Sequence, residues 1–323
     1  MKSYIPRPLY TKRIEPFIDK EVIKVITGQR RTGKSYILLQ ISDMIKKERP
    51  EANIIFVDKE QLAFAAIKNY MDLYQYVLKM TAGHSYNYLF VDEIQEIEDF
   101  QLCLRSLLNE NKCDIYCTGS NAKMLSGELA THLAGRYIEF PVHSLSYEEF
   151  LTFNRRQDSS ESLRLYLTFG GMPYIHNLAM ETNVIFEYLR NVYSTILLKD
   201  VVAREAIRNV SFLENLVAYL IDNTGSLFSA QNISKYLKSQ QVNIPTQTIL
   251  NYLRALCNSF FVYKIQRAET QGMKIFEIGE KYYFEDLGLH NAIRHFDFRK
   301  DINKLMENVV CIDLLRFGYE VYV

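Results

Sequence analysis

The chain has 323 residues, 48% of them hydrophobic and 24% charged, and its 38 Lys and Arg residues are balanced by 38 Asp and Glu residues. This composition matches an ordinary globular protein long enough for two or three domains, and the zero net charge argues against a dedicated nucleic-acid coat. No apolar stretch reaches about 18 residues and the N-terminus lacks a signal-peptide core, so we expect a cytoplasmic protein that does not enter a membrane.

The cysteines and histidines indicate no structural metal site. The five cysteines are odd in number and lack C-x-x-C spacing, as expected for reduced thiols in the core of a cytosolic protein. The six histidines are scattered along the chain and show no H-E-x-x-H spacing.

The first predicted elements lead into a phosphate-binding loop. Residues 1–21 carry three prolines and mixed charge, which predicts an arm with short turns. Residues 22–35 then predict a strand, a glycine loop and the start of a helix, with the sequence V-I-K-V-I-T-G-Q-R-R-T-G-K-S. The loop fits the pattern G-x-x-x-x-G-K-[ST] of phosphate loops.

The residue types of this loop suit a bound triphosphate. Its two glycines remove side chains and allow left-handed backbone angles, so that backbone N–H groups can wrap the phosphates. Lys34 can reach the β- and γ-phosphate oxygens, and Ser35 can offer its hydroxyl to Mg²⁺. The predicted nucleotide-binding residues are Gly28, Gln29, Arg30, Arg31, Thr32, Gly33, Lys34, Ser35 and Tyr36.

Further along the chain, strands alternate with helices. We expect strands at residues 22–26, 52–57, 88–91, 115–117 and 137–140. We expect helices after residue 35 and at residues 69–80, 100–108 and 124–134. The alternation predicts an α/β fold with a parallel sheet covered by helices on both faces, in a first domain that ends near Phe150.

Two adjacent carboxylates, Asp92 and Glu93, follow the apolar third strand. At the C-terminal edge of a parallel sheet, beside a phosphate loop, such a pair resembles a Walker B element. Asp92 would then hold Mg²⁺, directly or through water, and Glu93 would be the base that polarises the attacking water. The alternative is a D-E pair that begins an ordinary loop or caps a helix.

Ser120 and Asn121 follow the fourth strand in the run T-G-S-N. Ser120, with Asn121 as second choice, could hydrogen-bond the γ-phosphate or the attacking water, but a turn with a helix N-cap explains the same residues. Arg136 precedes the fifth strand and could act as a finger on a neighbouring subunit's nucleotide. Alternatively, Arg136 forms a surface pair with Glu139 or Glu128.

Together these motifs resemble those of a known family. The chain is similar, over about residues 5–323, to the predicted bacterial and archaeal ATPases of the AAA+ superfamily. The similarity rests on the ordered set G-Q-R-R-T-G-K-S, Y-L-F-V-D-E-I-Q, C-T-G-S-N-A-K-M-L-S, L-A-G-R, F-P-V-H-S-L-S-Y-E-E-F and F-G-G-M-P. It implies a P-loop core with Walker A, Walker B and sensor 1 elements, a helical segment, a winged helix and usually a C-terminal domain resembling restriction endonucleases.

Past Phe150 the periodicity becomes mainly helical. Residues 161–224 predict helices, with a break at G-G-M-P, residues 170–173, that is either a lid hinge or a simple turn. Two helices and a hairpin within residues 226–290 form a winged helix-turn-helix pattern. Its recognition helix, residues 245–258, carries one formal charge, so we expect a lid or docking role and only weak DNA binding.

The last residues, 306–323, predict an apolar helix followed by a strand. In the resembled family, acidic strands of the nuclease-like domain would come next. The sequence does not contain these strands, so Glu307 has no partner carboxylates in it and we assign no nuclease site. We expect this chain to be a fragment or a naturally shortened family member.

The predicted organisation has four parts. They are an ATPase domain over residues 1–150, a helical lid or linker over 151–225, a winged helix over 226–290 and the start of a shortened domain over 291–323. The expected activity is Mg²⁺-dependent ATP hydrolysis, with ATP and Mg²⁺ as cofactors and a homo-oligomer as one option. Catalysis is assigned to Glu93, Lys34, Ser120 and Arg136, and the metal to Ser35 and Asp92. A nucleotide-dependent switch that binds DNA or protein stays open, as does a kinase-like phosphotransferase.

Overall fold

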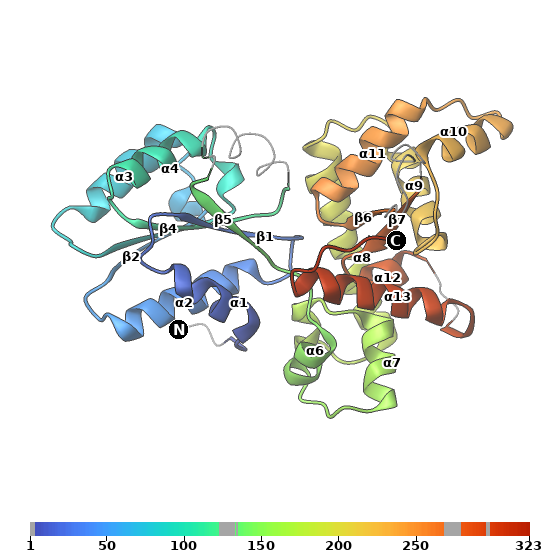
Figure 1. Ribbon diagram of the computed structural model, residues 1–323, viewed down its shortest axis with the longest axis horizontal. Helices are drawn as coiled ribbons and strands as arrows, with labels where there is room; N and C mark the ends of the chain where they lie inside the picture. Colours follow the sequence, from blue (N-terminus) through green and yellow to red (C-terminus); the bar gives the residue numbers. More distant parts are fainter. Residues whose placement is uncertain (1–3, 123–132, 134, 268–278, 295–297) are drawn as a thin grey trace. The chain divides into compact units, whose positions relative to one another are not determined.

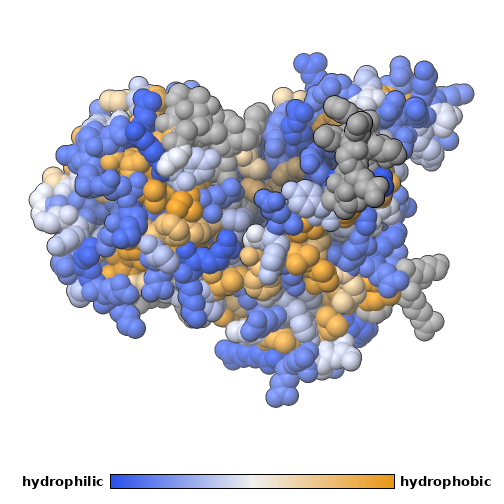
Figure 2. All heavy atoms as spheres, viewed as in Figure 1, coloured by the Kyte–Doolittle hydropathy of each residue, from blue (hydrophilic) through white to orange (hydrophobic). Residues whose placement is uncertain are grey.

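The computed structural model describes residues 4–122, 133, 135–267, 279–294 and 298–323. The chain forms two compact units. The first unit consists of Met1–Gly28 and Gly33–Val142, and the second unit consists of Gln29–Thr32 and His143–Val323. Charged and polar residues are interspersed with apolar ones over the visible face of each unit (Figure 2). Within the described residues, no helix has the length and apolar character needed to cross a membrane.

The first unit is built on a five-stranded parallel sheet (Figure 1). The strand order is β2-β3-β4-β1-β5, and every neighbouring pair in it runs parallel. The predicted α/β fold is therefore confirmed. The strands are β1 (Ile23–Thr27), β2 (Asn53–Asp58), β3 (Asn87–Asp92), β4 (Asp114–Gly119) and β5 (Tyr137–Pro141).

Helices cover both faces of this sheet. The main helices are α1 (Pro8–Ile14), α2 (Lys34–Glu48), α3 (Tyr70–Thr81) and α4 (Phe100–Asn109). Successive residues of a strand point to opposite faces, and accordingly Val25 packs in the apolar cluster under α3 and α4, whereas Ile26 packs with α1 and α2 (Figure 1). The arm expected at the N-terminus contains helix α1, which has a proline in its first turn, where the missing N–H group costs no hydrogen bond. The predicted helix at 124–134 lies almost entirely outside the described residues.

The second unit is mainly helical. Its helices are α6 (Tyr147–Phe153), α7 (Ser160–Phe169), α8 (Thr182–Thr195), the π-helix η6 (Ile196–Ala203), α9 (Val210–Asp222), α10 (Ala230–Ser239), α11 (Thr246–Asn258), α12 (Leu287–Ile293) and α13 (Phe298–Arg316). An antiparallel pair, β6 (Val262–Gln266) and β7 (Glu280–Phe284), follows α11. One apolar cluster draws buried residues from α8, α9, α10, α11, β7 and α12. The order α10, α11, β6, β7 is the one expected of the winged helix, which stays a prediction, as do the boundaries between the four predicted parts.

The strand predicted at the end of the chain is wrong. After α13, residues 317–323 form a turn and an extended tail without strand pairing. A strand needs a partner ladder, whereas here the N–H of Val323 donates to the carbonyl of Gln266 at 3.1 Å and Val321 packs beside Ile265. The tail is therefore held by this hydrogen bond and by apolar contacts, and not by a strand ladder.

Candidate nucleotide-binding site

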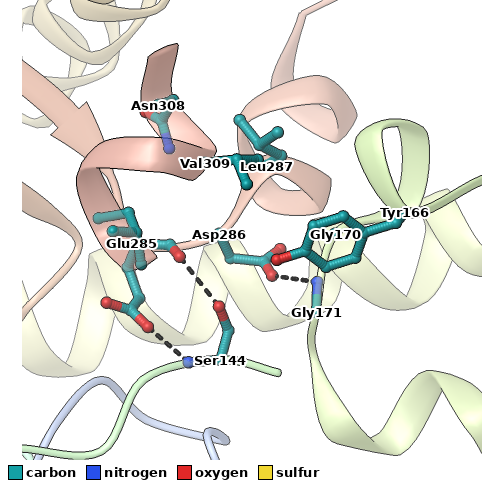
Figure 3. Close-up of a pocket in the computed structure, with 10 residues that line it drawn as sticks. Ser144, Tyr166, Gly170, Gly171, Glu285, Asp286, Leu287, Asn308 and Val309 are labelled. Atoms are coloured by element: carbon teal, nitrogen blue, oxygen red, sulfur yellow. Dashed lines mark hydrogen bonds between the residues drawn. The ribbon is translucent and has the colours of Figure 1, made fainter. Parts of the chain in front are cut away.

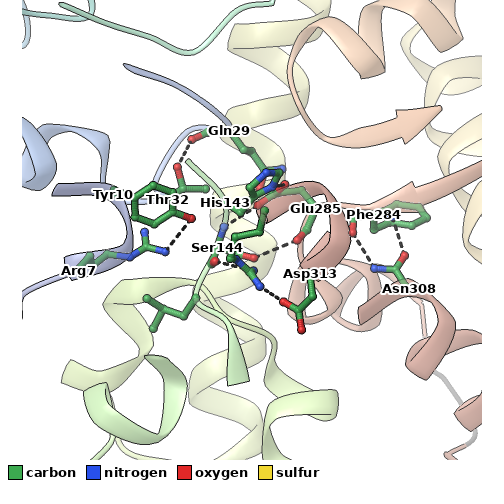
Figure 4. A network of polar contacts seen from close by, with 12 residues as sticks. Arg7, Tyr10, Gln29, Thr32, His143, Ser144, Phe284, Glu285, Asn308 and Asp313 are labelled. Carbon is green, nitrogen blue, oxygen red and sulfur yellow. Dashed lines mark hydrogen bonds and ion pairs between the residues drawn. The ribbon is translucent and has the colours of Figure 1, made fainter. Parts of the chain in front are cut away.

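The phosphate loop connects β1 to α2 through an unusual backbone path. Gly28, Arg31 and Gly33 have φ angles of 141°, 72° and 94°, in the range that favours glycine and strains other residues. The Thr32 hydroxyl donates to the carbonyl of Gln29 at 2.9 Å and closes the loop on itself (Figure 4). Left-handed residues beside right-handed ones can turn backbone N–H groups to one side, an arrangement found in concave anion sites.

Helix α2 begins directly at this loop. Gly33 is its N-cap, and Lys34 is the first helical residue. Lys34 is 4% exposed, so its ammonium group lies within the protein surface beside the loop. The N-terminal end of a helix of 15 residues carries a partial positive charge, which suits a phosphate group.

Asp92 lies at the end of β3 and contacts the start of α2. Its carboxylate accepts hydrogen bonds from the hydroxyls of Ser35 and of Thr118, the latter at 2.5 Å. Burial raises the pKa of Asp92, and the two hydroxyls and the charge of Lys34 oppose that rise. The structure thus brings the two residues predicted for the metal into direct contact. A hydroxyl and a carboxylate side by side fit Mg²⁺, which prefers oxygen ligands.

Glu93 lies beside Asp92 but has different neighbours. Its backbone is left-handed, with φ 56°, and its N–H donates to the hydroxyl of Thr118 at 2.9 Å. The Ser120 hydroxyl donates to Oε2 of Glu93 at 3.1 Å, and the side-chain amide of Gln95 donates to the same oxygen. The end of β4 therefore holds both carboxylates, because Thr118 contacts both residues and Ser120 contacts Glu93.

Two members of this cluster, Thr118 and Gln95, were not predicted from the sequence. Thr118 stands in the run T-G-S-N at the end of β4. Its contact with Asp92 follows from the pairing of β4 with β3, and this strand order is not visible in the sequence. Gln95 is part of the quoted run D-E-I-Q, and the short 3-10 turn Ile94–Glu96 brings it back toward Glu93.

Arg136 precedes β5, as expected, and its side chain is exposed. The guanidinium group donates to the side chain of Asn109. The pair expected with Glu139 is not formed, because the carboxylate of Glu139 accepts from the hydroxyl of Thr27 at 2.6 Å. Glu128, the other expected partner, lies outside the described residues.

A second buried polar cluster lies in the second unit, at the G-G-M-P break. The N–H of Gly171 donates to Asp286 at 2.7 Å (Figure 3). The N–H of Leu289 donates to the same carboxylate at 3.0 Å. A Cβ atom on Gly170 would lie 2.3 Å from the nitrogen of Gly288, so glycine is required by this close backbone approach. The cavity beside these residues has a volume of about 10 Å³, room for roughly one water molecule and far too small for a nucleotide.

The segment that follows β5 is fixed to the same cluster. Glu285 accepts from the N–H of Ser144 at 2.5 Å and lies 2.9 Å from Nδ1 of His143 (Figure 4). The carbonyl of Ser144 accepts from Arg316 at 3.0 Å. Among the described residues, no group of His, Cys, Asp and Glu side chains has the arrangement of a metal site. The hydrogen bonds of this cluster join the segments after β5 and α7 to residues that follow β7 and to Arg316. The candidate site is the one around Lys34 and Asp92.

Comparison with known proteins agrees with the α/β fold of the first unit. A protein-family model described as an AAA domain matches residues 20–151, and one described as a domain of unknown function matches residues 160–300. An uncharacterized protein of Haemophilus influenzae is 35% identical, over 100% of this chain and 81% of that protein. An uncharacterized protein of Methanocaldococcus jannaschii is 30% identical, over 92% of this chain and 67% of that protein. A Walker-type ATPase of Pyrococcus abyssi has a similar structure, with a TM-score of 0.62, 16% identity, and coverage of 90% of this chain and 96% of that one.

Proposed function

The chain belongs to the AAA+ family of P-loop ATPases, and from this premise we propose that it binds ATP together with Mg²⁺ and hydrolyses it. The observation that carries the proposal is the hydrogen bond between Ser35 and Asp92, which joins the start of α2 to the end of β3. Lys34 lies in the same place, and its charge acts on Asp92. The two residues proposed as metal ligands and the lysine proposed to bind phosphate therefore lie close together, next to the glycine loop.

Each of these groups has a role in binding. The loop and the first turn of α2 bind the phosphates through backbone N–H groups, and Lys34 contacts the β- and γ-phosphate oxygens. Ser35 and Asp92 supply oxygen ligands to the metal, and the hydroxyl of Thr118 orients Asp92. Bound Mg²⁺ neutralises the charge that develops on the phosphates.

Glu93 supplies the base. The residue is 7% exposed, and its carboxylate accepts hydrogen bonds from Ser120 and Gln95. A fixed carboxylate at the edge of the phosphate site can accept the proton of an attacking water. Ser120 reaches this carboxylate and is also the residue assigned to sense the γ-phosphate.

The test is phosphate release by wild type, Lys34→Ala and Glu93→Gln, with binding of a fluorescent ATP analogue measured in parallel. Lys34→Ala should abolish binding, because Lys34 contacts phosphate in the ground state. Glu93→Gln should keep binding and lose about 10²- to 10⁴-fold in turnover, because the base acts only on water. Turnover by Glu93→Gln equal to that of wild type would remove Glu93 as the base.

A nucleotide-dependent switch is the second candidate. It is supported by the succession of α10, α11 and the β6–β7 pair, an arrangement that can present a helix to a partner. In that case ATP binding would control the output and hydrolysis would be incidental. Glu93→Gln would then retain the ATP-dependent output, whereas Lys34→Ala would lose it.

A further inference from the structure

An ion pair in the second unit holds the tip of the phosphate loop. Nε of Arg30 donates to Oδ2 of Asp200 at 2.8 Å, and Nη2 donates to Oδ1 at 3.1 Å. Two parallel bonds between a guanidinium and a carboxylate fix both distance and orientation. Arg30 is 6% and Asp200 4% exposed, so solvent screens this pair little.

Asp200 is itself firmly placed. It belongs to the π-helix η6, and its neighbours Ile196, Leu197 and Val201 are buried in the large apolar cluster of the second unit. A second cation, Arg204, lies 3.2 Å from Oδ1 of Asp200. π-helices are rare and occur often at functional sites. The carboxylate of Asp200 therefore projects from a buried helix, and two cations, Arg30 and Arg204, balance its charge.

The position of Arg30 gives the ion pair control over the shape of the loop. Arg30 immediately precedes Arg31, the residue with φ 72°, and lies inside the short Gln29–Thr32 bridge. A left-handed arginine is strained and persists only where the surroundings hold it. Because the guanidinium fork is engaged by Asp200, the side chain of Arg30 anchors the loop and leaves phosphate binding to the backbone and Lys34.

Stability alone is a weak reason for such a pair. Removing two charges from water costs about as much as their attraction returns, so buried ion pairs contribute little net stability and are used to specify geometry. The geometry specified here is that of the anion-binding loop.

We propose that Asp200 is a positioning residue for nucleotide binding, which acts through Arg30 to hold the phosphate loop and couples that loop to the segment Ile196–Ala203. This inference rests on the proposed function, because it concerns the same nucleotide. Coupling is reciprocal. A bound nucleotide should therefore stabilise η6, although this helix lies far from the loop in sequence.

The experiment measures the dissociation constant of a fluorescent ATP analogue and the kcat and KM of phosphate release in the full chain. Asp200→Asn should raise the dissociation constant and KM on the order of 10-fold, a common size for coupling between sites, while kcat changes by less than about twofold. The control is Asp222→Asn, since Asp222 is paired with Arg294 in the same unit but is half exposed. Asp222→Asn should bind nucleotide like wild type.

A double-mutant cycle separates positioning from general damage. If Asp200 acts through Arg30, Asp200→Asn should add no further loss of affinity in an Arg30→Gln background. Amide hydrogen exchange should slow in residues 196–203 when ADP is added to wild type, and this slowing should be lost in Asp200→Asn. Additive losses in the cycle, or affinity of Asp200→Asn equal to wild type, would overturn the inference.

Two further controls keep the outcomes distinct. Should Asp200→Asn lose its cooperative thermal unfolding, Arg30→Lys takes its place, because it keeps the charge and loses the fork. Affinity of Arg30→Lys equal to wild type then counts against the inference. Failure of the wild-type chain itself to bind the ATP analogue overturns the proposed function and the inference together, whereas normal wild-type binding with unaffected variants overturns the inference alone.

Discussion

Adjacent carboxylates in one sequence can have different chemistry because their neighbours differ. Asp92 faces two hydroxyls and a lysine charge, an arrangement that suits a metal ligand. Glu93 turns away through a left-handed backbone angle and meets Ser120 and Gln95. The different surroundings of Asp92 and Glu93 therefore depend on a single backbone turn at the end of β3.

Gln95 offers a test of this arrangement. Gln95→Ala should reduce kcat by roughly 10-fold or more, because a base that is misplaced by about 1 Å loses much of its effect. Binding of an ATP analogue should stay within about twofold of wild type, since the side-chain hydrogen bonds of Gln95 seen in the described part of the chain go to Glu93 and Ser120. Steady-state phosphate release over a range of ATP concentrations separates the two effects. Unchanged kcat would show that Ser120 suffices to hold Glu93.

A second prediction at this scale concerns pH. Burial raises the pKa of Asp286 to about 7, from an ordinary value of 3.8 in the unfolded chain. Between about pH 4 and pH 7 the folded protein therefore holds a proton that the unfolded chain has lost. The free energy of unfolding should fall as pH rises through this window, by up to about 4 kcal/mol from this group.

Asp286→Asn removes the titrating group and should flatten that part of the profile. Urea unfolding at pH 5, 6, 7 and 8 measures the difference between variant and wild type. The matched control is Asp222→Asn, the same substitution at a half-exposed aspartate of the same unit. An unchanged slope in Asp286→Asn would mean that Asp286 is ionised throughout this range.

At the scale of elements, α11 presents little charge to a partner. Its apolar residues are buried against the cluster of the second unit, and its exposed positions are Gln247, Leu250, Asn251 and Arg254. The side chains of Gln247 and Asn251 hydrogen-bond each other at 3.0 Å. In the adjoining hairpin, Lys264 pairs with Glu280 at 2.9 Å. Among the described residues of α11, Arg254 is therefore the one cation at an exposed position, and phosphate contacts supply most of the affinity for DNA.

We therefore expect weak duplex DNA binding by the full chain. Fluorescence anisotropy at about 0.15 M salt, with and without ATP, should show no saturable binding below about 10⁻⁷ M, a limit tighter than the usual non-specific range. Arg254→Ala serves as a control for contacts made by α11 and should change little. Tight, salt-dependent binding that Arg254→Ala abolishes would instead identify α11 as a recognition helix.

For the whole molecule, Arg136 raises the question of assembly. Its side chain is exposed, and its guanidinium group donates to Asn109, the partner seen among the described residues. If it acts in trans, activity per subunit should rise with protein concentration, because the complete site forms only between copies.

Subunit mixing makes this prediction sharp. If the proposal holds, Arg136→Ala would lack the finger and Lys34→Ala would lack nucleotide binding, so the mixture should recover activity that neither variant has alone. Phosphate release is measured for each variant and for the mixture at equal total concentration. Turnover independent of concentration, without recovery on mixing, would leave Arg136 as a structural residue that holds Asn109.

By itself the sequence determined the order of elements in the first unit and the loop at its centre. Strand and helix periodicity is a local property, because it is set by residues close together in the sequence. The strands β1 to β5 accordingly form within about two residues of the expected ranges. The loop and the pair Asp92 and Glu93 were also visible, because their chemistry depends on residue type and spacing. The tail at 319–323 was mispredicted as a strand because its apolar pattern is local, whereas a strand also needs a partner.

Only the tertiary structure decided what surrounds these residues. Thr118 meets Asp92 because β4 lies next to β3, and strand order follows from packing and not from any local signal. The pairing of Arg30 with Asp200 joins positions 170 residues apart. Such contacts form when a whole apolar core closes and brings distant polar groups together, and a buried charge then requires the partner that this closure provides.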